Sequence, residues 1–159
     1  GIDKVIELYR LSKPVTIHAH NQLGWLYYIT GNYTDSVKHS LFAIITTISE
    51  AAEELGRYDP EFTLPALVDF LSTINKETPT SNRIVSGYLV SERFYESLYY
   101  LANSAYASGY VKSATDIWET LTNLKQAGEY QKLSKAQLET PSIKRPIKIE
   151  SKDLILPSL

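Results

Sequence analysis

Residues 21–43, NQLGWLYYITGNYTDSVKHSLFA, decide the fold. Their apolar residues recur at the three- and four-residue spacing of an α-helix, stop at Gly31-Asn32, and then resume. Leu23 and the small Gly24 let a second helix approach closely, and Gly31 provides the turn between the two helices. We therefore predict a hairpin of two antiparallel helices.

A second segment, residues 99–121, repeats this pattern at an offset of 78 residues. It reads YYLANSAYASGYVKSATDIWETL, with Gly109 in the place of Gly31 and the small Ala114 in the place of Ser36. A small residue early in the second helix leaves room for the first helix. The repeat therefore predicts a second hairpin built like the first.

Helical spacing continues through most of the remaining chain. Thr34 or Asp35 is expected to cap the second helix of the first hairpin, and Gly56 to end it. We predict one all-α domain over residues 1–139, followed by an extended tail at 140–159 with one possible short strand at 147–149. The expected helices cover residues 2–11, 15–29, 35–55, 64–75, 83–108 (bent near Gly87), 112–126 (ended by Gly128), and a last one reaching 138.

The hairpin residues resemble the tetratricopeptide repeat. Leu23-Gly24-x-x-Tyr27 is similar to the first-helix signature of that family, and Gly31-Asn32-Tyr33 is similar to its turn. Ala114-x-x-x-Trp118 resembles the small-then-aromatic step of its second helix. The sequence departs from the family in three ways. Ala102 stands where the family has a glycine, and the family's tryptophan is absent. The offset of 78 residues is also not a multiple of the family's repeat length of about 34 residues. The resemblance implies an array of helical hairpins, either a right-handed α-α superhelix or an irregular bundle.

The resemblance also implies that the first helix of each hairpin lines a concave binding groove. Helical spacing puts an aromatic and amide face there, without the basic residues that would clamp an acidic peptide. We predict that it binds an extended protein segment or a helix. The alternative that Trp25 packs against the first helix, expected at residues 2–11, stays open. The predicted groove residues are His18, Asn21, Trp25 and Tyr28 in the first copy, and Glu96, Tyr99, Asn103 and Tyr106 in the second.

The tail is the second predicted binding element. Residues 140–159, TPSIKRPIKIESKDLILPSL, contain three prolines and cannot continue a helix, yet they are rich in aliphatic side chains. Residues 131–159 are basic, with six basic and three acidic residues, although the whole chain has a net charge of −2. We expect the tail to dock on a neighbouring subunit or a partner, with packing on its own body as the alternative. The partner-binding residues expected there are Ile147, Ile149, Leu154, Ile155 and Leu156.

Composition and motifs argue against several other functions. The chain has no cysteine, so disulfides and thiolate chemistry are excluded. His18 and His20 are two positions apart in a helical context and therefore point in different directions, so no metal site is expected. No zinc-protease, nucleophile-elbow or phosphate-loop motif occurs, and we expect neither catalysis nor a cofactor. No apolar stretch is long enough to span a bilayer and no signal peptide is visible, so a cytoplasmic location is expected.

The sequence therefore predicts a non-catalytic protein-binding adaptor or a helical subunit of a larger assembly. One alternative is a structural subunit of the coat or filament type that self-assembles through its tail. Another is a small helical subunit of a ribonucleoprotein. Nucleic-acid binding is not expected from the body but is conceivable for the basic tail.

Overall fold

The computed structural model describes residues 17–58, 86–87, 89–90 and 92–144, and helix is the only regular structure in these ranges. This confirms the all-α class for the described part of the chain. The expected helices at 2–11 and 64–75 and the expected strand at 147–149 lie outside these residues. The elements are α2 (Ile17–Ile29), α3 (Tyr33–Tyr58), α6 (Phe94–Ala107), α7 (Val111–Thr122), the 3-10 helix η1 (Lys125–Ala127) and α8 (Glu129–Glu139).

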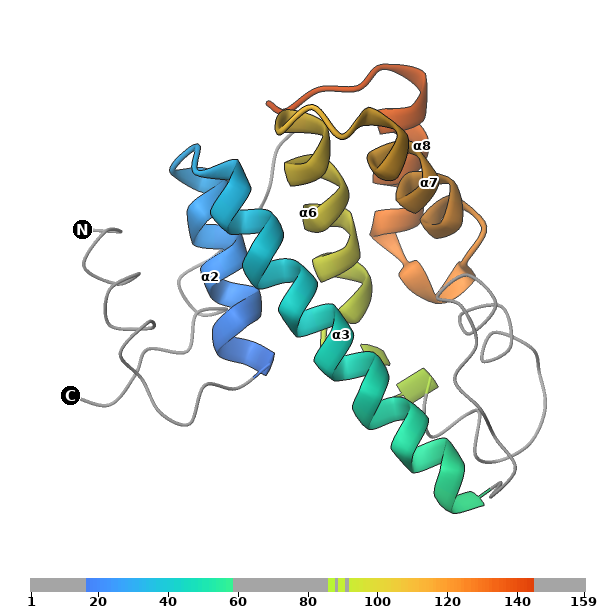
Figure 1. The fold of residues 1–159 in the computed structure, drawn as a ribbon. Coiled ribbons are helices and arrows are strands. Elements are labelled where there is room, and N and C mark those ends of the chain that lie inside the picture. Colours follow the sequence, from blue (N-terminus) through green and yellow to red (C-terminus); the bar gives the residue numbers. More distant parts are fainter. Residues whose placement is uncertain (1–16, 59–85, 88, 91, 145–159) are drawn as a thin grey trace.

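The helices pack in chain order. Helix α2 packs against α3, α3 against α6, α6 against α7, and α7 against α8 (Figure 1). Helix α6 also contacts α2 directly, so the two hairpins share an interface. The long helix α3 runs diagonally past the ends of α2 and α6 (Figure 1). None of the helices in the described ranges is long and apolar enough to cross a membrane.

One turn geometry joins the helices of both hairpins. Gly31 has φ 79° and Gly109 has φ 91°, a left-handed conformation that glycine adopts without a steric penalty. Asn32 N donates a hydrogen bond to Tyr27 O over 2.8 Å, and Tyr110 N donates to Ala105 O over the same 2.8 Å. Each donor–acceptor pair in the second turn lies 78 positions after its counterpart in the first. The two turns therefore share the same local geometry.

A small-residue junction holds the first hairpin against α6. Ser36 Oγ donates to Gly24 O over 2.6 Å and lies 2.7 Å from Ser104 Oγ. A Cβ added at Gly24 would overlap Ser40 Oγ and lie 3.3 Å from Ser40 N, so glycine is needed for this close approach of α2 and α3. Around the junction lies an apolar core whose largest fully buried side chains include Trp25, Trp118, Tyr99, Tyr100 and Phe94.

Several expected helix boundaries are wrong. Arg93 has φ 56°, which an α-helix does not contain, so α6 begins at Phe94 and the expected continuous helix over 83–108 does not form. Helix α3 begins at Tyr33, ahead of its expected caps Thr34 and Asp35, and passes through Gly56 to Tyr58.

The expected helix at 112–126 is also shorter than predicted. Helix α7 ends at Thr122, and the separate turn η1 follows it. Gly128, with φ 57°, then separates η1 from α8.

Candidate protein-binding site

Most of the predicted groove residues are buried. The exposed fractions are 3% for Asn21, 2% for Trp25, 6% for Tyr28, 1% for Tyr99 and 1% for Asn103. Only Glu96 and Tyr106 are half-buried. The expectation that this face forms an open groove is therefore not met.

The remaining predicted binding residues cannot be placed. The side chain of His18 and the tail residues Ile147, Ile149, Leu154, Ile155 and Leu156 lie outside what the structure describes. Their predicted roles remain predictions.

The predicted face is buried because α2 packs on α6. Ser97 Oγ donates to Asn21 Oδ1 over 2.5 Å, and Asn21 Nδ2 donates to Glu92 O over 3.3 Å. The Trp25 ring packs against the ring of Tyr100, with 5.6 Å between the centroids. Amide and aromatic groups on this face thus bind each other across the two hairpins.

The chain after α8 lies over the end of this interface, and we call residues 141–144 the strap. Figure 1 shows it turning back from α8 and crossing the end of α6. Its main chain is bound by two side chains of the body. Gln137 Nε2 donates to Ser142 O over 2.9 Å, and Ser142 N donates to Gln137 Oε1 over 2.8 Å. Tyr28 OH donates to Ile143 O over 2.8 Å.

The side chain of Gln137 is itself hydrogen-bonded to the buried side chain of Asn103. Its Nε2 also donates to Asn103 Oδ1 over 3.0 Å, and Trp118 Nε1 donates to the same oxygen over 3.1 Å. Asn103 Nδ2 is buried and has no hydrogen-bond partner. Gln137 is only 1% exposed beneath the strap. The amide that binds the strap is therefore fixed in orientation and shielded from water.

A shallow depression of about 530 Å³ lies beside the strap. Its apolar walls are Tyr106, Val111 and Ile143, and Val111 is 53% exposed. The half-buried Tyr106 is the predicted groove residue that remains accessible here. The site thus combines two main-chain clamps with an open apolar surface.

The aromatic and amide spacing predicts Tyr28, Asn103 and Tyr106 as lining of an open groove. The structure places Tyr28 against the strap and Asn103 behind Gln137. Gln137 was missed, because a glutamine on the last turn of a polar helix carries no signal until the chain turns back on it.

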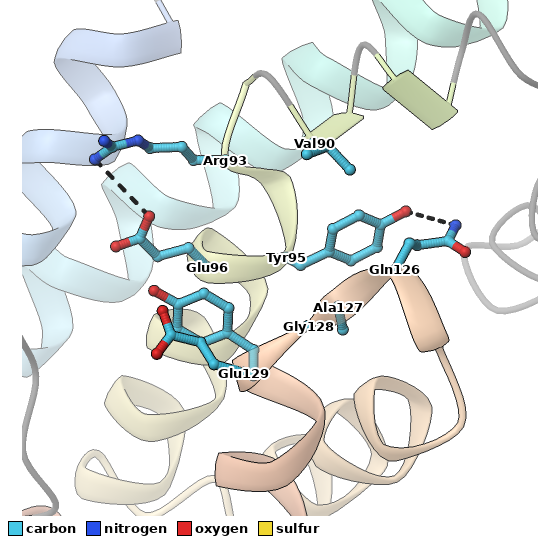
Figure 2. A pocket seen from close by; sticks show the side chains of 9 residues that line it. Val90, Arg93, Tyr95, Glu96, Gln126, Ala127, Gly128 and Glu129 are labelled. Carbon is cyan, nitrogen blue, oxygen red and sulfur yellow. Dashed lines mark hydrogen bonds and ion pairs between the residues drawn. The ribbon is translucent and has the colours of Figure 1, made fainter.

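A second cavity, of about 230 Å³, lies between the start of α6 and the start of α8 (Figure 2). Arg93 and Glu96 form an ion pair at 4.0 Å, and Gln126 Nε2 donates to Tyr95 OH over 2.8 Å. Burial raises the pKa of Tyr95 to about 12, although the hydrogen bond from Gln126 opposes that shift. Burial, followed by the charges of Glu96 and Glu129, also raises the pKa of Tyr130. Both phenols therefore stay protonated at neutral pH and offer hydrogen bonds, not a nucleophile.

Helix α3 carries an exposed apolar stripe formed by Leu41, Phe42 and Ile45. They are 43%, 51% and 56% exposed. The inward face of the helix uses other positions, such as Ser40 and Ile44, which are buried. Helix α3 thus carries large apolar residues on its outer face as well as its inward face.

Two histidines lie next to this stripe. His20 Nδ1 is 3.0 Å from His39 Nδ1, and the His20 and Phe42 rings have centroids 4.0 Å apart. Burial, followed by the charge of His39, lowers the pKa of His20 to about 4. Among the described residues no group of three or more potential metal ligands occurs. His20 is therefore neutral at neutral pH and packs with His39 between α2 and α3.

Comparison with known proteins shows a similarity to a longer protein. Over 127 residues the chain is 28% identical to an uncharacterized protein of Borreliella burgdorferi. The aligned stretch covers 78% of this chain and 38% of that protein. The chain therefore spans well under half the length of this relative. No protein family and no solved structure matches the chain.

Proposed function

We propose that this chain is a non-catalytic protein-binding module, either an adaptor or a helical subunit of a larger assembly. One observation carries the proposal: Gln137 and Tyr28 hold the main chain of a short non-helical segment, the strap, by three hydrogen bonds. A surface that binds backbone in this way suits a protein segment as its ligand. The resemblance of Leu23-Gly24-x-x-Tyr27 to the tetratricopeptide repeat supports the same function.

Main-chain recognition defines the class of ligand. The Gln137 amide uses both its oxygen and its nitrogen on one residue of the strap, so it fits a peptide group and not an isolated charge. Hydrogen bonds to main chain provide affinity, and a neighbouring apolar surface provides selectivity. In this site Tyr106 and Val111 supply that surface. The predicted tail residues Ile147 and Leu154 extend the same proposal to a longer segment.

A displayed library of random eight-residue peptides tests this function. We expect selection on the full chain to enrich peptides whose binding falls about tenfold in a Gln137→Leu variant, since one clamp is then lost. Gln131→Leu is the matched control, because Gln131 lies on the same helix and binds Thr122 O over 2.8 Å, away from the strap. Enriched peptides that bind both variants equally would place the ligand elsewhere.

A structural, self-assembling subunit is the second candidate, and the apolar stripe on α3 favours it. Three large aliphatic and aromatic side chains exposed on one helix face are suited to association between copies. Replacing Ile45, the most exposed of the three, by Lys should then lower the assembled mass in analytical ultracentrifugation while leaving the circular dichroism spectrum unchanged. A wild-type chain that sediments as a monomer at high concentration contradicts this candidate.

A further inference from the structure

We infer that the strap is an internal competitor: residues 141–144 occupy the segment-binding site and must leave before a partner segment enters. The inference rests on the proposed function and adds how access to the segment-binding site is regulated. The ligand that fits is a short non-helical protein segment with the backbone pattern of Pro-Ser-Ile-Lys. It offers one N–H and one C=O to Gln137, and the next C=O to Tyr28.

The strap makes the contacts of a ligand. Its hydrogen bonds to the body join main-chain atoms to the side chains of Gln137 and Tyr28, so a different segment could make the same contacts. Its own side chains are only loosely held. Pro141, Ile143 and Lys144 are exposed, and Ile143 is 38% exposed. The Ser142 hydroxyl accepts from Lys144 N over 3.2 Å, inside the strap itself. The three hydrogen bonds from Gln137 and Tyr28 thus hold the strap by its main chain.

The receptor side, in contrast, is held in place by several side-chain contacts. Gln137 is oriented by Asn103, and Asn103 is oriented by Trp118 on the neighbouring helix α7. Tyr28 packs against Tyr33 and Tyr100, with centroids 5.4 and 6.2 Å apart. A preorganised receptor with a loosely held internal segment is the arrangement in which a competing ligand can replace that segment.

Competition has a measurable signature. If the site is open only a fraction of the time, the apparent dissociation constant of an outside peptide is raised by the inverse of that fraction. Releasing the strap removes this factor. Ser142→Pro should release it, because proline lacks the N–H that binds Gln137 Oε1 and puts a ring carbon in its place. Ser142→Ala is the matched control, since it keeps the N–H and removes only the hydroxyl.

The probe is a fluorescein-labelled peptide with the sequence of residues 139–144, Glu-Thr-Pro-Ser-Ile-Lys, titrated into the full chain by fluorescence anisotropy. We expect the Ser142→Pro chain to bind it about tenfold or more tightly than the wild-type and Ser142→Ala chains do, if the strap is closed about nine-tenths of the time. Adding Gln137→Leu to Ser142→Pro should abolish the gain. The same peptide with an N-methyl group on its serine should bind none of the variants.

The outcomes separate the inference from the function on which it rests. Equal, measurable binding to all strap variants overturns the competition and leaves the segment-binding function standing. If the tighter binding of the Ser142→Pro chain persists when Gln137→Leu is added, the competition is also overturned, since the peptide is then bound elsewhere. Absence of binding in every variant, with helical circular dichroism retained, overturns both.

Discussion

Ser36 Oγ lies 2.7 Å from Ser104 Oγ, and this contact joins the two hairpins at the point where α2, α3 and α6 meet. Both side chains are fully buried. Because Ser36 also donates to Gly24 O, Ser104 is the donor in the contact between the two hydroxyls. The equivalent position in the second hairpin is Ala114, which has no hydroxyl, so the two hairpins share a turn but not this junction.

Replacing Ser36 by Ala should destabilise the protein by about 1–3 kcal/mol, because the buried Gly24 O and Ser104 Oγ lose their partner. Urea denaturation followed by circular dichroism measures the change. Ser113→Ala on the exposed face of α7 is the control and should be nearly neutral. In a double-mutant cycle, Ser36→Ala and Ser104→Ala together should cost less than the sum of the two single changes. Additive effects would show that the hydroxyls are not coupled.

Gly24→Ala should destabilise the α2–α3 hairpin by about 1–3 kcal/mol, since the added methyl group overlaps Ser40 Oγ in a closely packed junction. Gly87→Ala is the matched control, because Gly87 is exposed and nothing lies within 4 Å of an added Cβ. Ser40→Ala in the Gly24→Ala background should restore part of the loss by removing the overlapping oxygen. Thermal unfolding of the four proteins compares these effects. No difference between the two glycine variants would be inconsistent with the close approach of the helices.

Acid should weaken the fold through His20. The pKa of this residue is about 4 in the folded chain and about 6.5 when unfolded, so the unfolded state binds more protons between these values. The stabilisation is complete above pH 6.5 and is lost as the pH falls toward 4. Denaturation midpoints at pH 7 and pH 5 should therefore differ more in the wild type than in His20→Gln. Identical pH slopes in the two proteins would contradict a depressed pKa, and NMR titration of His20 reads that pKa directly.

Hydrogen exchange should report the strap in solution. The Ser142 amide donates to Gln137 Oε1, so its exchange should be slowed about tenfold or more relative to an unstructured peptide. Gln137→Leu should remove this protection, and Gln131→Leu should leave it intact. Two-dimensional NMR after transfer to D₂O measures the rates at a single residue. Rapid exchange of Ser142 in the wild type would mean that the strap is mostly open.

The hairpins were predictable because their turns depend on a residue with a strong local signal. Glycine is the residue that adopts positive φ most easily, and Gly31 and Gly109 both do so. Arg93 adopts the same region without any such signal, so the start of α6 was placed about ten residues too early. Gly56 gave the opposite error, because a glycine inside a helix costs only about 1 kcal/mol and α3 continues through it.

The open groove was mispredicted for a different reason. A helix face of aromatic and amide side chains has the same spacing whether it meets solvent, a ligand or another helix. Asn21 on that face binds Ser97 of α6, so its polar group is satisfied within the protein. Which of these surroundings a helix face meets depends on contacts between residues far apart in the chain, and a pattern within one helix does not contain that information.

The chain of hydrogen bonds behind the strap gives the protein an optical reporter of its own. Trp118 Nε1 binds Asn103 Oδ1, which binds Gln137 Nε2, which binds Ser142 O, so the indole lies three hydrogen bonds from the strap. The only other tryptophan, Trp25, has an indole nitrogen without a hydrogen-bond partner. In a Trp25→Phe chain, excitation at a wavelength that tyrosine does not absorb therefore gives emission from Trp118 alone. Its emission wavelength and quenching by acrylamide would follow opening of the strap in real time, in stopped-flow mixing with a peptide and without an attached dye.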